Sequence, residues 1–389
     1  MGISKRIRPR SKRLGHHKYT DETPERIKEN VVIPDAVPYS HPASEFVYGT
    51  AAVEAALRCS KRQFYKLYIY QSKHEELSPQ KVSLRKLALL KNIQVKMAFS
   101  EWETLLNTMS GGRPHNGLVL EASQLPQTPT QALKPVQLGE DQFRLELASQ
   151  TREEAAVNGS NDTIPMNRSF TQQHDRYPVI LLLSGITDPG NVGAAIRSAY
   201  YLGADAVVFA GPNSAPLSTV AIKASAGAAE NMTILRVFNE VDFIQRSQAN
   251  GWRFYAADAL SPGATYVDSA SIHNNPPTAT TSAPGEGGRE GEQDHEYPIN
   301  HAPSVIMLGH EGTGLSMHIK SQADAVVSIP GARLAPGMGV SSDPARVDSL
   351  NVSVAAALLI QMFMGGPLGV GPNLKGRKKK VVPNNEKPA

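Results

Sequence analysis

The 389-residue sequence is poor in cysteine and in long apolar runs. Its single cysteine, Cys59, excludes an internal disulfide framework and any zinc site built from cysteines. The longest apolar stretches, such as residues 354–360, fall well short of the roughly 20 residues that a membrane-spanning helix needs. We therefore expect no disulfide, no metal centre and no association with a membrane.

Standard nucleotide-binding motifs are also missing. No G-x-x-x-x-G-K-[ST] loop occurs, and the glycines of "GHEGTG" (309–314) do not have the spacing of the dinucleotide fingerprint G-x-G-x-x-G. No Ser-His-Asp elbow or pair of carboxylates stands out either. The chain is nevertheless long enough for two or three domains, each with its own core.

Acidic residues are absent from the first twenty residues, which carry seven Lys or Arg although the net charge of the whole chain is only +4. A second basic block, "LKGRKKKVV" (374–382), lies near the other end. Such blocks are typical of solvated arms that favour polyanions. By composition the N-terminal block fits a mitochondrial presequence and an RNA-binding tail equally well.

Composition divides the chain into five segments. We expect a basic, disordered N-terminal segment (1–45), a small α/β module (46–122), a linker (123–177), a large domain (178–365) and a basic C-terminal tail (366–389). Within the large domain, the low-complexity stretch 269–303 is expected to be a disordered insertion between two strands.

Periodicity indicates the secondary structure of both domains. In the small module we expect helices at 50–58 and 79–92 and strands at 66–71, 93–99 and 117–122. In the large domain, short apolar runs predict strands at 179–184, 206–211, 232–237, 253–258, 304–309 and 325–330. Continuous rather than alternating hydrophobicity is typical of strands that are covered on both faces, so these strands predict a parallel sheet with flanking helices.

Three polar or glycine-rich corners follow strands of this predicted sheet: Asp188–Arg197, Leu308–Ser316 and Ile329–Leu359. They are the candidate site, because ligands of open α/β sheets collect outside the carboxyl ends of the strands. Each corner also has a purely structural interpretation. Its glycines can serve tight turns, and Asn191 or Ser349 can be the N-cap of a helix.

Arg197 is harder to explain structurally. Its neighbours Ala194, Ala195 and Ile196 leave the predicted helix little polar surface. We therefore expect its charge to lie in a cleft or to pair with a carboxylate, for which Glu311 is the candidate.

Taken in order, "DPGNVGAAIRSAYYLGADAVV", "VIMLGHEGTGLS" and "IPG…SLNVSVAAALL" resemble the three motifs of the SpoU/TrmH family, the 2′-O-ribose RNA methyltransferases of the SPOUT superfamily. The resemblance covers nearly all of residues 178–365. "EFVYGTAAVEAALRCSKRQFYKLYIY" and "RPHNGLVLEA" are similar to the L30e-like substrate-binding domain of that family, which extends the resemblance to residue 46.

The resemblance implies an α/β fold with a SPOUT-type knotted parallel-sheet domain (a deep trefoil knot), preceded by the small L30e-like α/β domain. It also implies an obligate homodimer, and S-adenosyl-L-methionine held by backbone groups at Gly309, Ile329 and Leu350. One departure is "ARLAPGMGVSSDPARVD", which separates Ile329 from Ser349 where the family has a short link. The alignment of positions 331–348 therefore stays open.

Arg197 matches the arginine that the family is proposed to use as the activating group. Since arginine is not deprotonated in proteins, we expect Arg197 to grip the adjacent phosphate and orient the 2′-oxygen rather than to act as a base. Asn191, Glu311, Ser349 and Asn351 are then expected to hold that arginine and the ribose.

The small module is expected to bind the RNA. Its candidates for phosphate contacts are Arg58, Lys61, Arg62, Lys66, Arg85 and Lys86. Its aromatic residues Phe64, Tyr65 and Tyr68 are expected to lie in the core instead.

The function that the resemblance implies is S-adenosyl-L-methionine-dependent 2′-O-methylation of a guanosine in large-subunit rRNA. The small module is most similar to that of fungal mitochondrial members, which favours the mitochondrial matrix. One alternative is a tRNA methyltransferase, but tRNA-modifying members often lack the L30e-like domain. The other is a ribosome-assembly factor that binds rRNA without methylating it.

Overall fold

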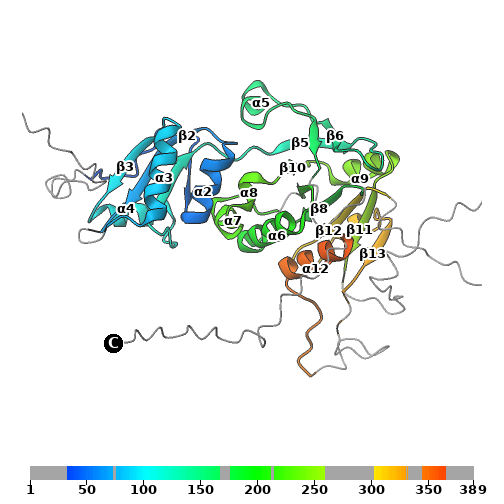
Figure 1. Cartoon of the computed structure of the whole chain (residues 1–389). Coiled ribbons are helices and arrows are strands. Elements are labelled where there is room, and N and C mark those ends of the chain that lie inside the picture. Colours follow the sequence, from blue (N-terminus) through cyan, green and yellow to red (C-terminus); the bar gives the residue numbers. More distant parts are fainter. Residues whose placement is uncertain are drawn as a thin grey trace, which may run out of the picture. The chain divides into compact units, whose positions relative to one another are not determined.

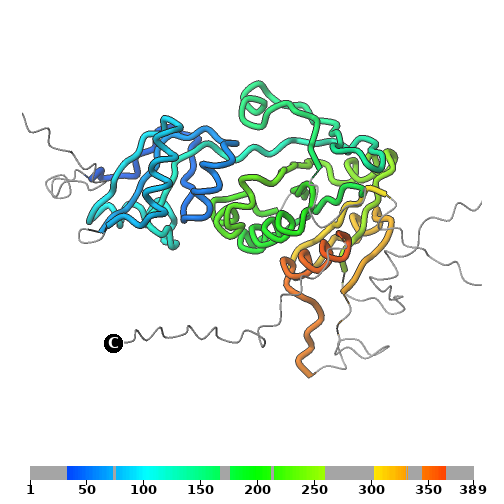
Figure 2. Tube along the Cα trace, in the orientation of Figure 1, coloured from blue at the N-terminus to red at the C-terminus, as the bar shows by residue number. Residues whose placement is uncertain are grey.

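The computed structural model divides the chain into two compact units, residues 1–125 and 126–389 (Figures 1 and 2). The structure describes residues 33–72, 76–166, 176–211, 214–258, 302–329, 331 and 344–364. The predicted N-terminal segment, both predicted insertions and the C-terminal tail lie wholly or largely outside these residues. In the described ranges, no helix has the length and hydrophobicity to cross a membrane.

The first unit is a four-stranded sheet with the strand order β1-β4-β2-β3. Its elements are β1 (Glu45–Tyr48), α2 (Thr50–Cys59), β2 (Phe64–Tyr70), α3 (Pro79–Leu90), β3 (Gln94–Ala98), α4 (Trp102–Met109) and β4 (Leu118–Ala122). β2 and β3 pair in parallel, whereas β4 runs antiparallel to β1 and β2. The five elements predicted for this unit are confirmed to within a few residues; β1 and α4 carried no prediction.

Aromatic side chains form part of the core of this unit. Tyr68 on β2 is fully buried, and its ring centroid lies 5.9 Å from that of Trp102 at the start of α4. Phe46 of β1 packs into the same cluster. The prediction that Tyr68 lies in the core is confirmed, whereas Phe64 and Tyr65 are only half-buried.

The second unit is built on a nine-stranded sheet with the order β13-β11-β12-β8-β9-β10-β5-β6-β7. Its strands are β5 (Thr128–Leu133), β6 (Gln142–Leu147), β7 (Thr163–Pro165), β8 (Val179–Ser184), β9 (Ala206–Ala210), β10 (Ile234–Arg236), β11 (Arg253–Ala257), β12 (Ser304–Leu308) and β13 (Ala325–Val327). Its helices are α5 (Arg152–Asn158), α6 (Pro189–Leu202), α7 (Thr219–Ala224), α8 (Ala228–Asn231), α9 (Glu240–Ala249), α11 (Met317–Lys320) and α12 (Val352–Met364). β8 to β13 pair in parallel throughout, which confirms the predicted parallel sheet.

Helices cover both faces of this sheet (Figure 1). On β11, Phe254 meets Phe243 of α9, with ring centroids 6.0 Å apart. The next residue, Tyr255, meets Phe363 of α12 at 5.0 Å. Since successive side chains of a strand point to opposite faces, α9 and α12 lie on opposite sides of the sheet. α6 lies on the α12 side, because the two helices pack along each other.

The prediction that residues 123–177 form a linker is wrong for most of this range. β5 extends the parallel sheet beside β10, and β6 and β7 follow it antiparallel. Trp252 anchors this extension: its Nε1 donates to the Lys134 carbonyl at 3.0 Å, and its ring lies edge-on to that of Phe143 at 5.6 Å. The local sequence has little hydrophobic periodicity, because these strands are buried by partners more than 100 residues further along the chain.

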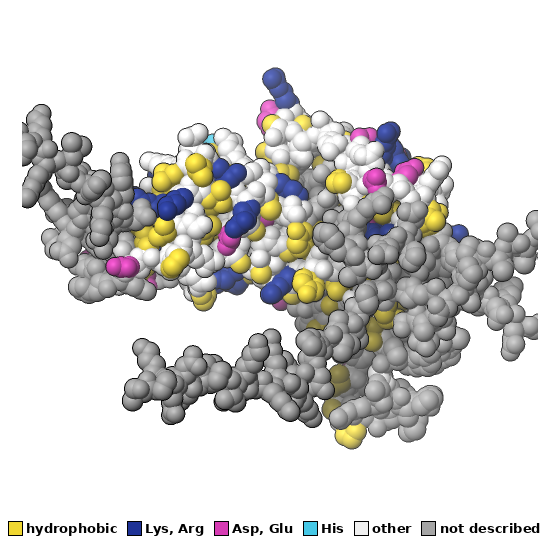
Figure 3. All heavy atoms as spheres, viewed as in Figure 1, with side chains coloured by type: hydrophobic (Ala, Val, Ile, Leu, Met, Phe, Trp, Pro, Cys, Tyr) yellow, Lys and Arg dark blue, Asp and Glu magenta, His cyan; other side chains and the backbone are white. Residues whose placement is uncertain are grey.

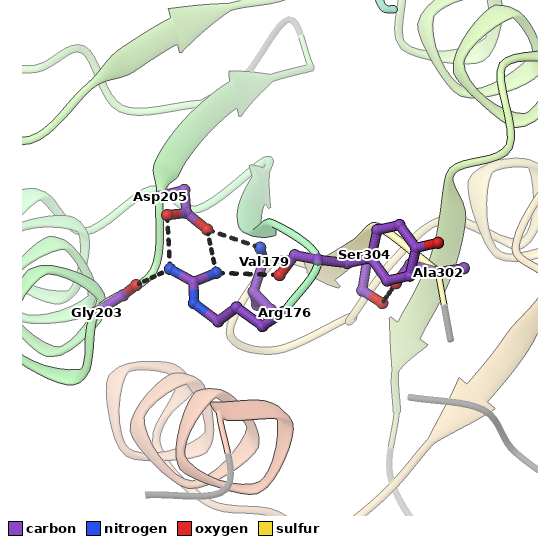
Figure 4. A network of polar contacts seen from close by, with 7 residues as sticks. Arg176, Val179, Gly203, Asp205, Ala302 and Ser304 are labelled. Carbon is purple, nitrogen blue, oxygen red and sulfur yellow. Dashed lines mark hydrogen bonds and ion pairs between the residues drawn. The ribbon is translucent and has the colours of Figure 1, made fainter. Parts of the chain in front are cut away.

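A buried ion pair fixes the amino ends of β8 and β9 (Figure 4). The two terminal nitrogens of Arg176 lie 2.7 and 2.8 Å from the two carboxylate oxygens of Asp205, whose side chain is completely buried. The same carboxylate accepts the Val179 backbone N–H at 2.9 Å. The cost of burying a charged carboxylate is well offset when an arginine binds both of its oxygens and a backbone N–H donates to it as well.

Candidate active site

The corner after β8 is organised by the start of α6. Asp188 is the N-cap of this helix: its carboxylate accepts the backbone N–H groups of Gly190 and Asn191, each at 3.1 Å. Pro189 takes the first helical position, where its missing N–H costs nothing. The interpretation of Asn191 as the N-cap is therefore wrong, and its side chain is free for another role.

Gly193 lets α6 approach α7 closely. A Cβ atom at this position would lie 2.3 Å from the Ala221 carbonyl oxygen and 2.6 Å from the Ala224 Cβ. Both distances are far below van der Waals contact, so only glycine fits. Gly193 of the first motif thus allows α6 and α7 to pack together and does not face a ligand.

The corner after β12 is a closed loop. The His310 N–H donates to the Gly314 carbonyl at 3.2 Å, and the Gly314 N–H donates back at 2.8 Å. Inside this loop His310 Nδ1 accepts the backbone N–H groups of Gly312 and Thr313 at 3.0 and 3.2 Å. Gly309 must be glycine, because a Cβ there would lie 2.2 Å from the Gly314 carbonyl carbon and the Leu315 nitrogen.

The corner before α12 is held by Asn351. Its Oδ1 accepts the backbone N–H of Ser353 at 2.9 Å and the Ser353 hydroxyl at 2.6 Å, and its carbonyl accepts the N–H of Ala355 at 2.9 Å. Asn351 is therefore the N-cap of the helix. The interpretation of Ser349 as this cap is wrong: its hydroxyl donates to the adjacent Asp348 at 2.9 Å, and the residue is exposed.

One chain of hydrogen bonds joins the three corners. Glu311 Oε1 accepts Asn191 Nδ2 at 3.2 Å and the Asp188 N–H at 3.3 Å, and its Oε2 accepts the Thr187 N–H at 3.4 Å. Asn191 Oδ1 in turn accepts Asn351 Nδ2 at 3.1 Å. The corners can meet because β8 and β12 are adjacent and in register, with Leu183 opposite Leu308.

The carboxyl of Glu311 is held ionised by these donors. Partial burial alone raises its pKa, but hydrogen bonds from its own N–H, from Asn191 and from the backbone of Thr187 and Asp188 outweigh that effect and lower the pKa below the ordinary value. At neutral pH the carboxylate is thus a fixed acceptor that orients the Asn191 amide, whose oxygen then faces Asn351.

Arg197 stands apart from this network, against expectation. It is exposed on α6, and among the described residues no carboxylate pairs with it; Glu311 binds Asn191 and the Thr187–Asp188 backbone instead. The buried positions of the helix are Val192, Gly193, Ala195, Ile196 and Ala199. Arg197 is not one of these positions and lies on the exposed side of the helix. Its guanidinium is therefore available to a ligand or to another chain.

The predicted cofactor residues lie around the same corners. Gly309 follows β12, Ile329 follows β13, and Leu350 directly precedes the N-cap Asn351. Ile329 is half-buried and Leu350 is 48% exposed. Backbone N–H and C=O groups can hydrogen-bond the polar edge of an adenine ring, and apolar side chains such as those of Ile329 and Leu350 can pack against its face, so these three residues stay the predicted cofactor contacts.

The basic residues predicted to contact RNA differ in their availability. Arg62 is buried and pairs with Glu45 and with the Ser123 carbonyl, so its selection for phosphate contact is wrong. Arg58 is exposed but pairs with Glu54 at 2.7 Å. Lys61 and Lys86 are exposed. The space-filling view shows Lys and Arg side chains over the part of this unit that carries α2 and α3 (Figure 3).

Two family models match this chain. The SpoU rRNA Methylase family matches residues 178–361, and the RNA 2′-O ribose methyltransferase substrate-binding domain matches residues 46–128. The mitochondrial rRNA methyltransferase 1 of Schizosaccharomyces pombe is 33% identical over 319 residues, which are 82% of this chain and 88% of the relative. The 23S rRNA (guanosine-2′-O-)-methyltransferase RlmB of Vibrio parahaemolyticus is 24% identical over 322 residues, 82% of this chain and 95% of the relative.

The chain therefore belongs to the SpoU rRNA methylase family. Among solved structures, the AdoMet-bound rRNA methyltransferase from Sinorhizobium meliloti superposes with a TM-score of 0.51 at 20% identity, covering 82% of this chain and 87% of that chain. This likeness confirms the predicted fold class. The trefoil knot stays a prediction, because residues 332–343 and those beyond 364 lie outside the described part of the chain.

Proposed function

We propose that this protein transfers the methyl group of S-adenosyl-L-methionine to the 2′-hydroxyl of a guanosine in mitochondrial large-subunit rRNA. The observation that carries the proposal is the hydrogen-bonded path Glu311–Asn191–Asn351, which ties together three loop corners at the carboxyl edge of a parallel sheet. The names of the relatives support the substrate: a mitochondrial rRNA methyltransferase and a guanosine-2′-O-methyltransferase.

Gly309, Ile329 and Leu350 would hold the cofactor, which supplies an electrophilic methyl group on a sulfonium centre when bound. The contribution of the chain is to align the ribose hydroxyl with that centre, and a well-aligned pair of reactants is worth roughly 7–11 kcal/mol. The ionised Glu311 fixes Asn191 and the start of α6, and Asn351 fixes the start of α12. The two asparagines are then rigid supports for the ribose.

Arg197 binds the phosphate next to the target ribose in this proposal. Its exposed guanidinium has the fork geometry that matches a phosphate, and arginine side chains are not deprotonated in proteins, which argues against a role as the base. Ser349, exposed beside the same corner, would contact the RNA rather than the network.

A homodimer completes the proposal. Beside Arg197 the outer side of α6 exposes Tyr200 (40%) and Tyr201 (87%), and α12, which packs along α6, exposes Val354 (47%) and Leu358 (42%). This α6–α12 face is apolar enough to be covered by a second copy. A copy seated there would lie beside Arg197, at the edge of the active site.

Methylation of a large-subunit rRNA fragment tests the function. We expect the full-length protein to give one mapped 2′-O-methylguanosine, and the Arg197→Ala variant to lose at least about 100-fold in kcat/KM while still binding S-adenosyl-L-methionine. Arg152→Ala, an exposed arginine on α5, is the matched control and should remain active. Methylation of tRNA instead, or rRNA binding without methylation by the wild type, would overturn the proposal. The Arg197→Lys variant tests whether the planar guanidinium group is required. If this variant retains the kcat of the wild type, a positive charge at this position is sufficient.

A further inference from the structure

Phe238, two residues after the end of β10, has a large apolar side chain that is 69% exposed. Above its ring lies the guanidinium of Arg236, with 5.5 Å between the guanidinium carbon and the ring centroid. Arg236 is the last residue of β10, and Phe238 lies two positions further on, where the chain bends towards α9. The cation covers one side of the ring and leaves the other open.

The pair lies on the same edge of the sheet as the candidate active site. Leu308, Leu183, Phe209 and Arg236 form one row across β12, β8, β9 and β10, because each is the register partner of the next. Phe238 follows this row by two residues, as His310 does on β12. With strands about 4.8 Å apart, Phe238 lies roughly 10 Å from the end of β8. A nucleotide that neighbours the target ribose can span this separation.

The backbone on either side of Phe238 is fixed. The Val237 N–H donates to the Phe209 carbonyl at 2.9 Å, which continues the pairing of β10 with β9. Asn239 then caps α9 by accepting the Asp242 N–H at 3.2 Å. An exposed ring on a fixed backbone loses little conformational entropy when it binds a partner.

The charge around the ring favours a polyanion. Among the described residues Arg236 has no carboxylate partner, so its positive charge is unneutralised. The nearest acid in sequence, Glu240, turns its carboxyl inward, where Oε2 accepts the Ser184 hydroxyl at 3.0 Å and Oε1 is buried. Burial also raises the pKa of Glu240 above its ordinary value.

We propose that Phe238 and Arg236 form a stacking site for an unpaired nucleobase of the RNA substrate, beside the nucleotide whose ribose is methylated. Proteins recognise single-stranded RNA by stacking bases on aromatic rings and guanidinium planes. A base on the open side of Phe238 would complete a stack of arginine, phenylalanine and base, while the arginine draws in the adjoining phosphate. This inference rests on the proposed function, since it assigns a binding site for the same RNA.

Binding and kinetics of Phe238 variants of the full-length protein test this site, with the rRNA fragment that the wild type methylates as the probe. Loss of one stacked base corresponds to a rise in Kd of roughly 5- to 100-fold. We expect Phe238→Ala to raise the Kd and KM for RNA by such a factor and to leave the KM for S-adenosyl-L-methionine within about twofold. Phe238→Tyr should retain binding, whereas Phe238→Leu should behave like alanine. Val157→Ala, an exposed apolar residue on α5, is the control that should leave both values unchanged.

The outcomes distinguish the possible occupants. If Phe238→Leu binds RNA as the wild type does, aliphatic contact suffices and stacking is wrong. If Phe238→Ala changes the oligomeric state in sedimentation instead of RNA affinity, the ring belongs to a protein interface and the inference falls. Unchanged RNA affinity in Phe238→Ala, with full methylation by the wild type, overturns this inference alone. Wild-type protein that neither binds nor methylates RNA overturns the proposed function as well.

Discussion

Asn351 donates its side-chain N–H to the side-chain oxygen of Asn191 at 3.1 Å, across 160 residues of sequence. The same Asn351 caps α12 through its own Oδ1, so the nitrogen of this amide serves the link to Asn191 and its oxygen serves the stability of the helix. This division allows the two roles to be separated by substitution.

Asn351→Asp and Asn351→Ala should differ in stability and agree in activity. Aspartate is as good an N-cap as asparagine but has no N–H to donate, whereas alanine loses both roles. We expect Asn351→Ala to lose about 1 kcal/mol, a fall in Tm of roughly 2–4 °C, and Asn351→Asp to keep the Tm of the wild type. Both should lose roughly 5- to 10-fold in kcat. An aspartate variant with wild-type kcat would show that the link to Asn191 is dispensable.

Glu311→Gln should change the pH dependence of stability. The pKa of Glu311 is lower in the folded state than in the unfolded chain, so its stabilising contribution is complete above the unfolded value of about 4.3 and is lost as the pH falls through the folded value. The wild type should therefore have the higher Tm from pH 7 to about 5, and the difference should shrink below about pH 4.5. Melting curves of both proteins across this range check the prediction. A difference that does not vary with pH would contradict it.

Gly193→Ala should destabilise the protein, although alanine is the better helix former by about 1 kcal/mol. The added methyl group would meet the Ala221 carbonyl oxygen at 2.3 Å and force α6 and α7 apart. Overpacking of this kind costs about 1–3 kcal/mol, so we expect a net loss in the free energy of unfolding measured with denaturant. Gly312→Ala is the control, because its Cβ would meet only the His310 ring at 3.5 Å.

Arg176→Met and Asp205→Asn should each be strongly destabilising. Each removes one charge of a buried ion pair and leaves the opposite charge unneutralised, which typically costs about 3–5 kcal/mol. The double variant should cost clearly less than the sum of the two, because no uncompensated charge then remains. Denaturant unfolding of all four proteins measures this coupling. Additive effects would show that the two side chains act independently.

Continuous apolar runs were sufficient to predict the central strands. "VILLLS" and "SVIM" have no polar face, and the strands that they form, β8 and β12, lie inside the sheet between helices. The cap of α6 is also within reach of the sequence, since Asp188 directly precedes a proline; the alternative interpretation of Asn191 as an N-cap is the one that fails. The exposure of Arg197 follows from helical spacing, because the buried positions of α6 leave it on the outer side.

Other features depend on contacts that no local pattern contains. β5 to β7 become strands because β10 offers an edge and Trp252 covers them. Glu311 meets Asn191 rather than Arg197 because β8 and β12 are neighbours in register, which places one corner directly against the other. The sequence analysis selected Asn191, Glu311 and Asn351, which the fold brings together, but the pairing among them follows from the strand order.

The pairing of β5 with β10 determines where the chain can be divided into separate fragments. A fragment that begins at residue 178, where the family match begins, would keep all three motifs but would strip β10 of its neighbour and uncover the ring of Trp252. Bare edges of this kind recruit other chains into aggregates. An autonomous catalytic fragment should therefore begin near residue 126, so that the stretch between the two family matches travels with the methyltransferase half and not with the RNA-binding half.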